Sequence, residues 1–279
     1  MTIKSFAKKM LPKTVWNFLR HGRGIARDLW ENKGSRVCRT RYCGFDVCYG
    51  PGDLLIKKTR DGKIFEEKMC RLIVEDLGKA ADPVFLDIGA NIGLISLYVA
   101  SKLPTARIFA FEPGPKQSGF FARTIALNGL AERVTLAADA VGEKEEKKTF
   151  MTHFSQDASG DGFIDTGRAG EPTSIDVTVR TLDAWWVEAG RPKVNVVKID
   201  TEGSELLVLR GATTFLASVR PVVYLEIEPK NLKVYPYKRD DILKWFQAHD
   251  YRLSTLDGEL CTPENFTGFI GRYDTYIAR

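Results

Sequence analysis

The sequence predicts an α/β protein with a mostly parallel central sheet and helices on both of its faces. From residue 83 onward, short apolar runs of strand length alternate with longer segments of helical periodicity. Parallel strands need long crossover connections, usually helices, and this alternation supplies them. With 279 residues, 44% of them hydrophobic and 28% charged, the chain has the length and composition of a globular protein with one large domain and an appendage.

The elements of the main domain follow from this pattern. The expected strands, each an apolar run, are residues 84–89, 106–113, 133–142, 194–200 and 221–228. The expected helices are residues 65–78, 91–103, 114–130, 182–190, 204–219 and 239–249. Further strand-like runs occur at 147–154, 175–181, 251–256 and 273–278. Pro115 near the start of one helix and Asn128-Gly129 at its end are helix-terminus signals.

A basic N-terminal extension is expected at residues 1–64, ahead of a main domain at residues 65–279. Residues 1–35 have apolar side chains at roughly helical spacing, and Asp61-Gly62 between two β-like runs is a hairpin signal. Residues 1–40 hold ten Lys/Arg against two acids, so the rest of the chain, with a total of +5, is mildly acidic. We expect a helix packed on the main domain; contact with an anionic membrane or a partner, and disorder, are the alternatives. The acidic body disfavours a nucleic-acid-binding face.

Signals of export and membrane insertion are absent from the sequence. No run of 18 apolar residues occurs, and the N-terminus lacks the apolar core of a secretory signal. Five cysteines, an odd number, indicate reduced thiols and a cytoplasmic protein. Cys38, Cys43 and Cys48 do not have a zinc-site spacing, so they are expected to be ordinary thiols.

An acidic residue ends each of the five expected main-domain strands. These residues are Asp87, Glu112, Asp139, Asp200 and Glu226, with Glu228 just beyond. Ligands of open α/β sheets bind outside the carboxyl ends of the strands, so we expect one shared acidic crevice there. For Asp87 alone, a turn or helix-cap role is the alternative. The crevice suits a ligand with hydroxyl groups and positive charge, and it would repel phosphates.

The turn Gly89-Ala90-Asn91-Ile92-Gly93 is compatible with two cofactors. A dinucleotide fingerprint has three glycines and an acid about 20 residues further on, a place that Glu112 fills. However, Asn91 replaces the glycine that lets the backbone approach a pyrophosphate. S-adenosyl-L-methionine has the same ribose and adenine, a sulfonium and no phosphate. The sequence therefore favours this cofactor, with NAD as the alternative.

Five segments together resemble the FkbM-type S-adenosylmethionine-dependent methyltransferases, over about residues 65–230. They are "FLDIGANIG" (85–93), "FAFEPGP" (109–115), "VRTLDAW" (179–185), "VKIDTEGSELLVLRGA" (197–212) and "YLEIEP" (224–229). The resemblance implies a class I methyltransferase, Rossmann-like fold: a seven-stranded, mostly parallel sheet whose last strand is antiparallel. It also implies methylation of hydroxyl groups on sugars or natural products.

The resemblance further implies a set of residues that bind S-adenosyl-L-methionine. Those expected around its methionine end are Asp87, Gly89, Ala90, Asn91 and Gly93. Glu112, followed by Pro113, would hold the ribose hydroxyls, and Asp139 with Ala140 would border the adenine. The first 64 residues and the last 50 carry little of the resemblance.

Three carboxylates are candidates for a catalytic base: Asp200, Glu202 and Glu226. A sugar hydroxyl is a poor nucleophile, and a positioned base contributes roughly 10²–10⁴-fold to its reaction. Asp200 is the first choice because it directly follows the buried run "VVKI". Glu202 has a helix-cap role as its alternative, and Lys198 is expected to pair with one of these acids. His153 is a rival base, with a structural role as its alternative.

No metal site is expected. Mg²⁺ between Asp200 and Glu226 is an alternative, and residues 157–165 match a calcium loop only in part, since Arg168 stands where a glutamate is needed.

Residues 155–172, rich in Gly, Asp and Ser, are expected to form a loop that closes over the acceptor. The expected function is O-methylation of a sugar, glycan or glycosylated secondary metabolite; an NAD-dependent oxidoreductase or an inactive binding module is the alternative. The oligomeric state is not predicted.

Overall fold

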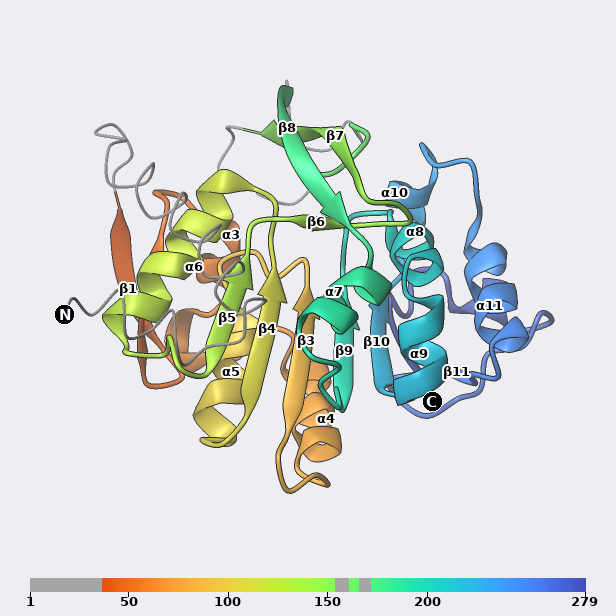
Figure 1. Ribbon diagram of the computed structural model, residues 1–279, viewed down its shortest axis with the longest axis horizontal. Coiled ribbons are helices and arrows are strands. Elements are labelled where there is room, and N and C mark those ends of the chain that lie inside the picture. The colour runs from red at the N-terminus through yellow and green to blue at the C-terminus, as the bar shows by residue number, and fades with distance from the viewer. Residues whose placement is uncertain (1–36, 154–160, 166–171) are drawn as a thin grey trace.

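The central sheet has seven strands, in the order β11-β12-β10-β9-β3-β4-β5 (Figure 1). The computed structural model describes residues 37–153, 161–165 and 172–279. The strands are β3 (Val84–Ile88), β4 (Arg107–Phe111), β5 (Val134–Ala137), β9 (Val196–Ile199), β10 (Val222–Glu226), β11 (Leu253–Thr255) and β12 (Thr275–Ala278). β12 is antiparallel to both of its neighbours, and the other neighbouring pairs are parallel. The predicted class I methyltransferase sheet is thus confirmed, with its last strand reversed.

Helices cover both faces of the sheet because successive strand residues point to opposite sides. Leu86 and Val197 belong to one buried cluster, and Phe85 and Val196 belong to the other. The first cluster is completed by α7 (Leu182–Glu188), α8 (Glu205–Arg210), α9 (Thr213–Val219) and α11 (Arg239–Ala248). The second is completed by α4 (Glu67–Leu77), α5 (Leu94–Lys102) and α6 (Pro115–Leu127). The sheet is therefore buried on both faces, as continuous apolar strands require.

The N-terminal hairpin forms at a different turn from the predicted one. Strands β1 (Cys38–Tyr42) and β2 (Phe45–Tyr49) pair across Cys43-Gly44. The prediction at Asp61-Gly62 was wrong: α3 (Leu54–Lys58) runs into a short 3₁₀ turn, η1 (Arg60–Gly62). Asp53 favours this helix because its carboxylate accepts the N–H of Ile56 at 3.1 Å. The hairpin packs on α6, where the N–H of Cys48 donates to Thr124 Oγ1 at 2.9 Å.

Two predicted elements are each divided in two. The run 133–142 holds β5 and then β6 (Ala140–Val141), which leaves the central sheet to pair with β8 (Pro172–Arg180). β8 also pairs with β7 (Glu146–His153), and this three-stranded sheet lies beyond the carboxyl ends of the central strands (Figure 1). The helix predicted at 204–219 is broken between α8 and α9. At the break, a Cβ on Gly211 would lie 2.0 Å from the carbonyl oxygen of Gly142, so this backbone approach requires glycine.

The remaining predicted elements occur with shifted ends. The helix predicted from residue 91 begins at Leu94, because Asn91 and Gly93 are left-handed, with φ of 53° and 86°. The sequence missed the short helix α10 (Pro229–Leu232) and the 3₁₀ turn η2 (Phe266–Phe269). The basic segment 1–35 and most of the loop 155–172 lie outside the described residues. The domain boundary at residue 65 stays a prediction.

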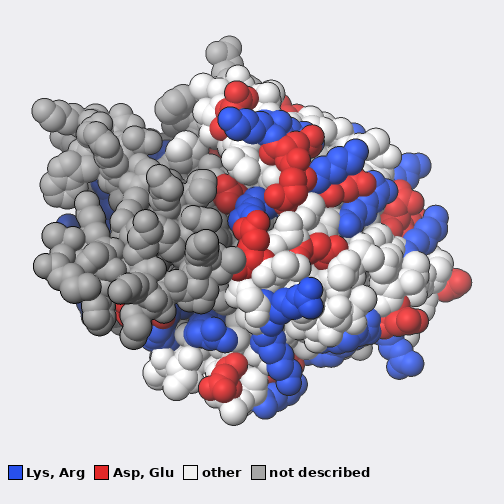
Figure 2. Space-filling view, in the orientation of Figure 1, with Lys and Arg blue, Asp and Glu red and all other residues white. Residues whose placement is uncertain are grey.

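Charged side chains of both signs are interspersed over the described part of the face in Figure 2. No helix in the described part of the chain combines the length and hydropathy needed to cross a membrane.

Candidate active site

A cavity of about 290 Å³ lies at the carboxyl edge of the central sheet. This volume is close to the roughly 300 Å³ at which small-molecule sites begin. Its walls include the turn after β3 and residues at or just beyond the ends of β4, β5, β9 and β10. The predicted acids that line it are Glu112, Asp139, Asp200, Glu202, Glu226 and Glu228. The structure therefore gathers the strand-end acids around one space, with the exception of Asp87.

The five backbone N–H groups of the turn after β3 all donate hydrogen bonds to oxygen atoms of the protein itself. These hydrogen bonds run from Gly89 and Ala90 to Phe111 O (both 2.9 Å), from Asn91 to Glu112 Oε2 (2.8 Å), from Ile92 to Asn91 Oδ1 (2.8 Å) and from Gly93 to Ala90 O (2.8 Å). A pyrophosphate-binding turn must offer such N–H groups to the ligand. In this turn all five are already paired, which disfavours a dinucleotide.

Both glycines of the turn are required by space as well as by backbone conformation. Gly89 has a φ of 75°, and a Cβ there would lie 1.8 Å from the carbonyl oxygen of Asp200. Gly93 has a φ of 86°, and a Cβ there would lie 2.2 Å from the ring of Phe121. Gly89, Ala90 and Asn91 line the cavity, whereas Gly93 lies behind it and sets the start of α5.

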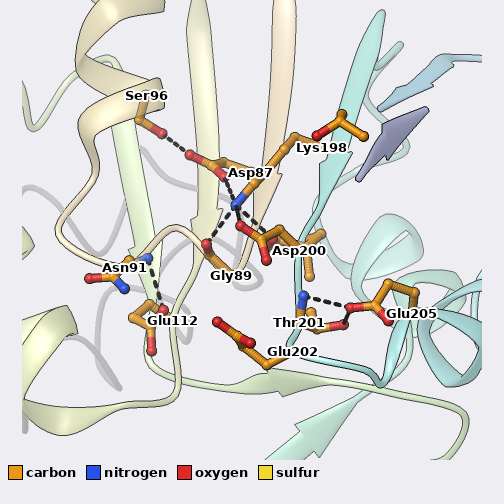
Figure 3. Close-up of polar contacts among 12 residues, drawn as sticks. Asp87, Gly89, Asn91, Ser96, Glu112, Lys198, Asp200, Thr201, Glu202 and Glu205 are labelled. Carbon is orange, nitrogen blue, oxygen red and sulfur yellow. Dashed lines mark hydrogen bonds and ion pairs between the residues drawn. The ribbon is translucent and has the colours of Figure 1, made fainter. Parts of the chain in front are cut away.

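Glu112 links the turn to the end of β4. Its carboxylate accepts the N–H of Asn91 at 2.8 Å (Figure 3). It also accepts the N–H of Gly114 at 2.8 Å, and the side chain is buried. Burial raises the pKa of Glu112 to about 7, although the two backbone donors act to lower it. Each carboxylate oxygen can accept a second hydrogen bond, so the group can still bind hydroxyls in the cavity. Pro113 and Ala140 of the predicted cofactor set also line the cavity.

Asp87 is buried behind the cavity and pairs with Lys198. Its Oδ2 accepts a hydrogen bond from Ser96 Oγ at 2.7 Å, and its Oδ1 lies 3.4 Å from Lys198 Nζ. Lys198 Nζ also lies 3.3 Å from Asp200 Oδ2. Burial by itself lowers the pKa of Lys198, but the Asp200 and Asp87 carboxylates outweigh it and raise that pKa. The expectation that Asp87 lines the crevice is therefore wrong, because its side chain serves a buried cation.

The three candidate bases have different surroundings. The Asp200 side chain is 33% exposed and lines the cavity beside Lys198. Burial raises the pKa of Glu226 well above its ordinary value, and the carboxylate of Asp200 and a hydrogen bond with it add to that shift. Glu202 has a φ of 54°, and its Oε2 accepts a hydrogen bond from Asn231 Nδ2 at 2.7 Å. Asp200 thus has a paired cation, and Glu226 favours its protonated form.

The N-cap residue of α8 is Ser204, not Glu202, and the carboxylate of Glu205 holds the segment ahead of this helix. One oxygen of the Glu205 carboxylate accepts the N–H groups of Thr201 and Gly203, at 2.9 and 3.0 Å, and the Thr201 hydroxyl at 3.0 Å. This buried carboxylate holds the chain between β9 and α8, so it fixes the segment that carries Asp200 and Glu202. Glu205 was not a predicted site residue.

Some cavity residues were not predicted as site residues. Asp161 lines the cavity; its Oδ1 accepts the N–H of His153 at 2.8 Å and lies 3.2 Å from the His153 ring Nδ1. His153 is buried, which favours its structural role. Glu66 and Asp274 also line the cavity, from the segments ahead of α4 and β12. The sequence held a weak indication of Asp161 as a site residue, because Asp161 falls in the partial calcium-loop pattern. It held no indication of Glu66 or Asp274.

Within residues 37–153, 161–165 and 172–279, no group of three or more His, Cys, Asp or Glu side chains is arranged to hold a metal ion. The five cysteines are free thiols.

Comparison with known proteins identifies the family. A model of the methyltransferase FkbM domain matches residues 87–253, more than half of the chain. The AMB antimetabolite synthetase AmbE of Pseudomonas aeruginosa is 28% identical over 232 residues, 71% of this chain. This chain spans only 10% of the length of AmbE.

Two shorter relatives match as well. The hexuronic acid methyltransferase AglP of Haloferax volcanii is 31% identical, over 60% of this chain and 66% of AglP. The 2-O-methyltransferase NoeI of Sinorhizobium fredii is 29% identical, over 59% of this chain and 71% of NoeI. With the family match and the sheet topology, these similarities lead to one conclusion: the chain belongs to the FkbM methyltransferase family and is a methyltransferase.

Proposed function

We propose that this protein transfers a methyl group from S-adenosyl-L-methionine to a hydroxyl of a sugar, glycan or glycosylated metabolite. One observation carries the proposal: Glu112 of the expected cofactor set and Asp200 of the expected catalytic set line the same cavity. The names of AglP, a hexuronic acid methyltransferase, and NoeI, a 2-O-methyltransferase, support an oxygen acceptor on a sugar.

The residues around the cavity fit the methyl donor. Glu112 would accept hydrogen bonds from the ribose hydroxyls, and Asp139 and Ala140 would border the adenine. Phe150 and Phe163, whose ring centroids are 5.9 Å apart, add aromatic surface to the cavity wall. The turn Gly89–Asn91 would hold the methionine end. When bound, the donor supplies an electrophilic methyl group on a sulfonium, and a carboxylate-rich lining favours that positive charge.

Asp200 is the proposed general base. It would accept the proton of the acceptor hydroxyl at its carboxylate, next to the Lys198 ammonium 3.3 Å away. Glu226 would keep its own proton and donate a hydrogen bond to Asp200, since its raised pKa favours the neutral acid. Glu202 ranks behind both because Asn231 already binds its carboxylate. Holding the acceptor oxygen, methyl carbon and sulfur in line would supply much of the rate, roughly 7–11 kcal/mol in favourable cases.

Two alternatives remain for comparison. An NAD-dependent oxidoreductase is disfavoured by the internally paired N–H groups of the turn at 89–93 and by the family. An inactive binding module with the same fold would keep the cofactor site but not turn over. Release of S-adenosylhomocysteine separates this last alternative from the proposal.

The test begins with calorimetric titrations of S-adenosyl-L-methionine and NAD into the purified protein. We expect saturable binding of the first and none of the second; the reverse result would reject the proposal. Turnover is then measured as S-adenosylhomocysteine release across a panel of sugars and secondary metabolites, with mass spectrometry of the product. Asp200→Asn should lower turnover by roughly 10²–10⁴-fold and keep cofactor affinity. Asp82→Asn, an exposed aspartate outside the cavity, is the matched control and should change neither.

A further inference from the structure

We propose that Lys198 is a positioning residue that joins two parts of the cavity wall. One is the turn after β3, on the proposed cofactor side, and the other is the pair Asp200 and Glu226, on the proposed acceptor side. The Lys198 ammonium holds the Gly89 carbonyl and Asp200 at a fixed separation and keeps the Asp200–Glu226 pair from taking up a second proton. The terms cofactor side and acceptor side rest on the proposed function, whereas the contacts of Lys198 do not depend on it.

Lys198 contacts both the turn after β3 and the residue that follows β9 (Figure 3). Nζ donates a hydrogen bond to Gly89 O at 2.7 Å and approaches Ile88 O at 3.4 Å. It also lies 3.4 Å from Asp87 Oδ1 and 3.3 Å from Asp200 Oδ2. An ammonium has three N–H donors, and four oxygen atoms surround this one. The β3 turn and the end of β9 are therefore fastened to the same cation.

Burying the ammonium group of a lysine at the position of Lys198 costs free energy. Lys198 lies within the central strand β9, directly opposite Asp87 in the parallel pairing of β9 with β3. The Lys198 side chain is 4% exposed and that of Asp87 is 1% exposed. An apolar pair of similar volume would often give an equally stable sheet, since burying two charges costs much of what their attraction returns. The polar bridge is better explained by what it does at the strand ends than by stability alone.

Carboxylates surround this cation on several elements. Those that face it or the Asp200–Glu226 pair are Asp87 of β3, Glu112 after β4, Asp200 and Glu202 after β9, Glu226 of β10, Glu205 of α8, Glu66 ahead of α4 and Asp274 ahead of β12. Of the lysines that line the described cavity, Lys58 of α3 is exposed and Lys198 is buried. Without Lys198, Asp200 and Glu226 would share a space dominated by negative charge and would bind protons at higher pH.

A double variant distinguishes the proposed positioning role of Lys198 from a purely structural one. Lys198→Met removes the ammonium but leaves Asp87 buried without its cation, so the chain can fail to fold. Lys198→Met with Asp87→Asn removes both buried charges and restores the balance. Lys79→Met is the matched control, since Lys79 also pairs with an aspartate, Asp76, at 2.6 Å, and does not line the cavity.

The first measurement is a ¹³C NMR titration of side-chain carboxyls, with the Asp200 and Glu226 signals assigned from Asp200→Asn and Glu226→Gln. In the folded double variant we expect the titration of the pair to move upward by at least one pH unit. The second is calorimetry with S-adenosylhomocysteine, for which we expect at least a tenfold loss of affinity. The control variant should match the wild type in both.

A folded double variant with wild-type titration and wild-type affinity would overturn the proposal and leave Lys198 a structural residue. A wild-type protein that binds no S-adenosylhomocysteine would overturn the proposed function instead. In that case the titration still decides whether Lys198 sets the charge of the pair, and an unchanged midpoint rejects it.

Discussion

Replacing Glu112 with glutamine should remove a pH-dependent loss of stability. Burial raises the pKa of Glu112 from 4.5 to about 7. Because the pKa is higher in the folded chain than in the unfolded chain, the folded chain holds a proton that the unfolded chain has released between these two pH values. The stabilising contribution is therefore complete below pH 4.5 and is lost as the pH rises through about 7.

The size of this effect follows from the shift. Each pH unit of difference between the folded and unfolded pKa is worth about 1.4 kcal/mol. The shift to about 7 thus corresponds to roughly 3 kcal/mol, of which about 2.5 kcal/mol is lost between pH 5 and pH 8. Glutamine cannot ionise, so Glu112→Gln should lack this part of the pH dependence. Glutamine forms weaker hydrogen bonds with the N–H groups of Asn91 and Gly114 than the carboxylate does. This difference lowers the free energy of unfolding by an amount that does not vary with pH.

The assay is urea unfolding of both proteins at several values between pH 5 and pH 8. The quantity of interest is the free energy of unfolding of Glu112→Gln minus that of the wild type, which should rise by about 2.5 kcal/mol across this range. The difference isolates Glu112, because the other buried carboxyls titrate in both proteins. A difference that stays constant within roughly 0.5 kcal/mol, the usual limit of additivity, would refute the burial argument for Glu112.

Three further predictions concern the same site. Asp200→Asn should lower kcat by roughly 10²–10⁴-fold while calorimetry shows unchanged S-adenosylhomocysteine affinity; a kcat near the wild type would remove Asp200 as the base. Gly89→Ala should cost at least about 1–3 kcal/mol in urea unfolding, because the added Cβ would lie 1.8 Å from Asp200 O; a neutral result would contradict the close approach. Glu205→Gln should cost about 1–3 kcal/mol, since its carboxylate accepts the N–H groups of Thr201 and Gly203; an equally stable variant would show that this carboxylate does not hold the segment.

Much of the fold was predictable because its signals are local. The apolar runs that become β3, β4, β9 and β10 and the helical periodicity between them depend on near neighbours in the chain. The split after β5 was not predictable, because β6 turns away to pair with β8 through Ala140 and Val179, which are distant in sequence. The break at Gly211 depends in the same way on the backbone of Gly142.

The site was predictable in outline for a similar reason. Acids at strand ends point to the carboxyl edge of any parallel sheet, and this placed Glu112, Asp200 and Glu226 correctly around the cavity. Asp87 differs because it pairs with Lys198 on the neighbouring strand, and strand order is not a local property. Glu66 and Asp274 reach the cavity only through tertiary packing of the segments ahead of α4 and β12.

The proposed reaction of this protein is the transfer of a methyl group to oxygen. The most direct measurement is ¹³C NMR of reactions with S-adenosyl-L-methionine labelled in its methyl group and a panel of sugars and glycosylated metabolites. We predict a new methyl ether signal with at least one acceptor, and its loss in Asp200→Asn. A methyl signal on nitrogen, carbon or sulfur, or no transfer to any acceptor by a protein that binds the donor, would contradict it.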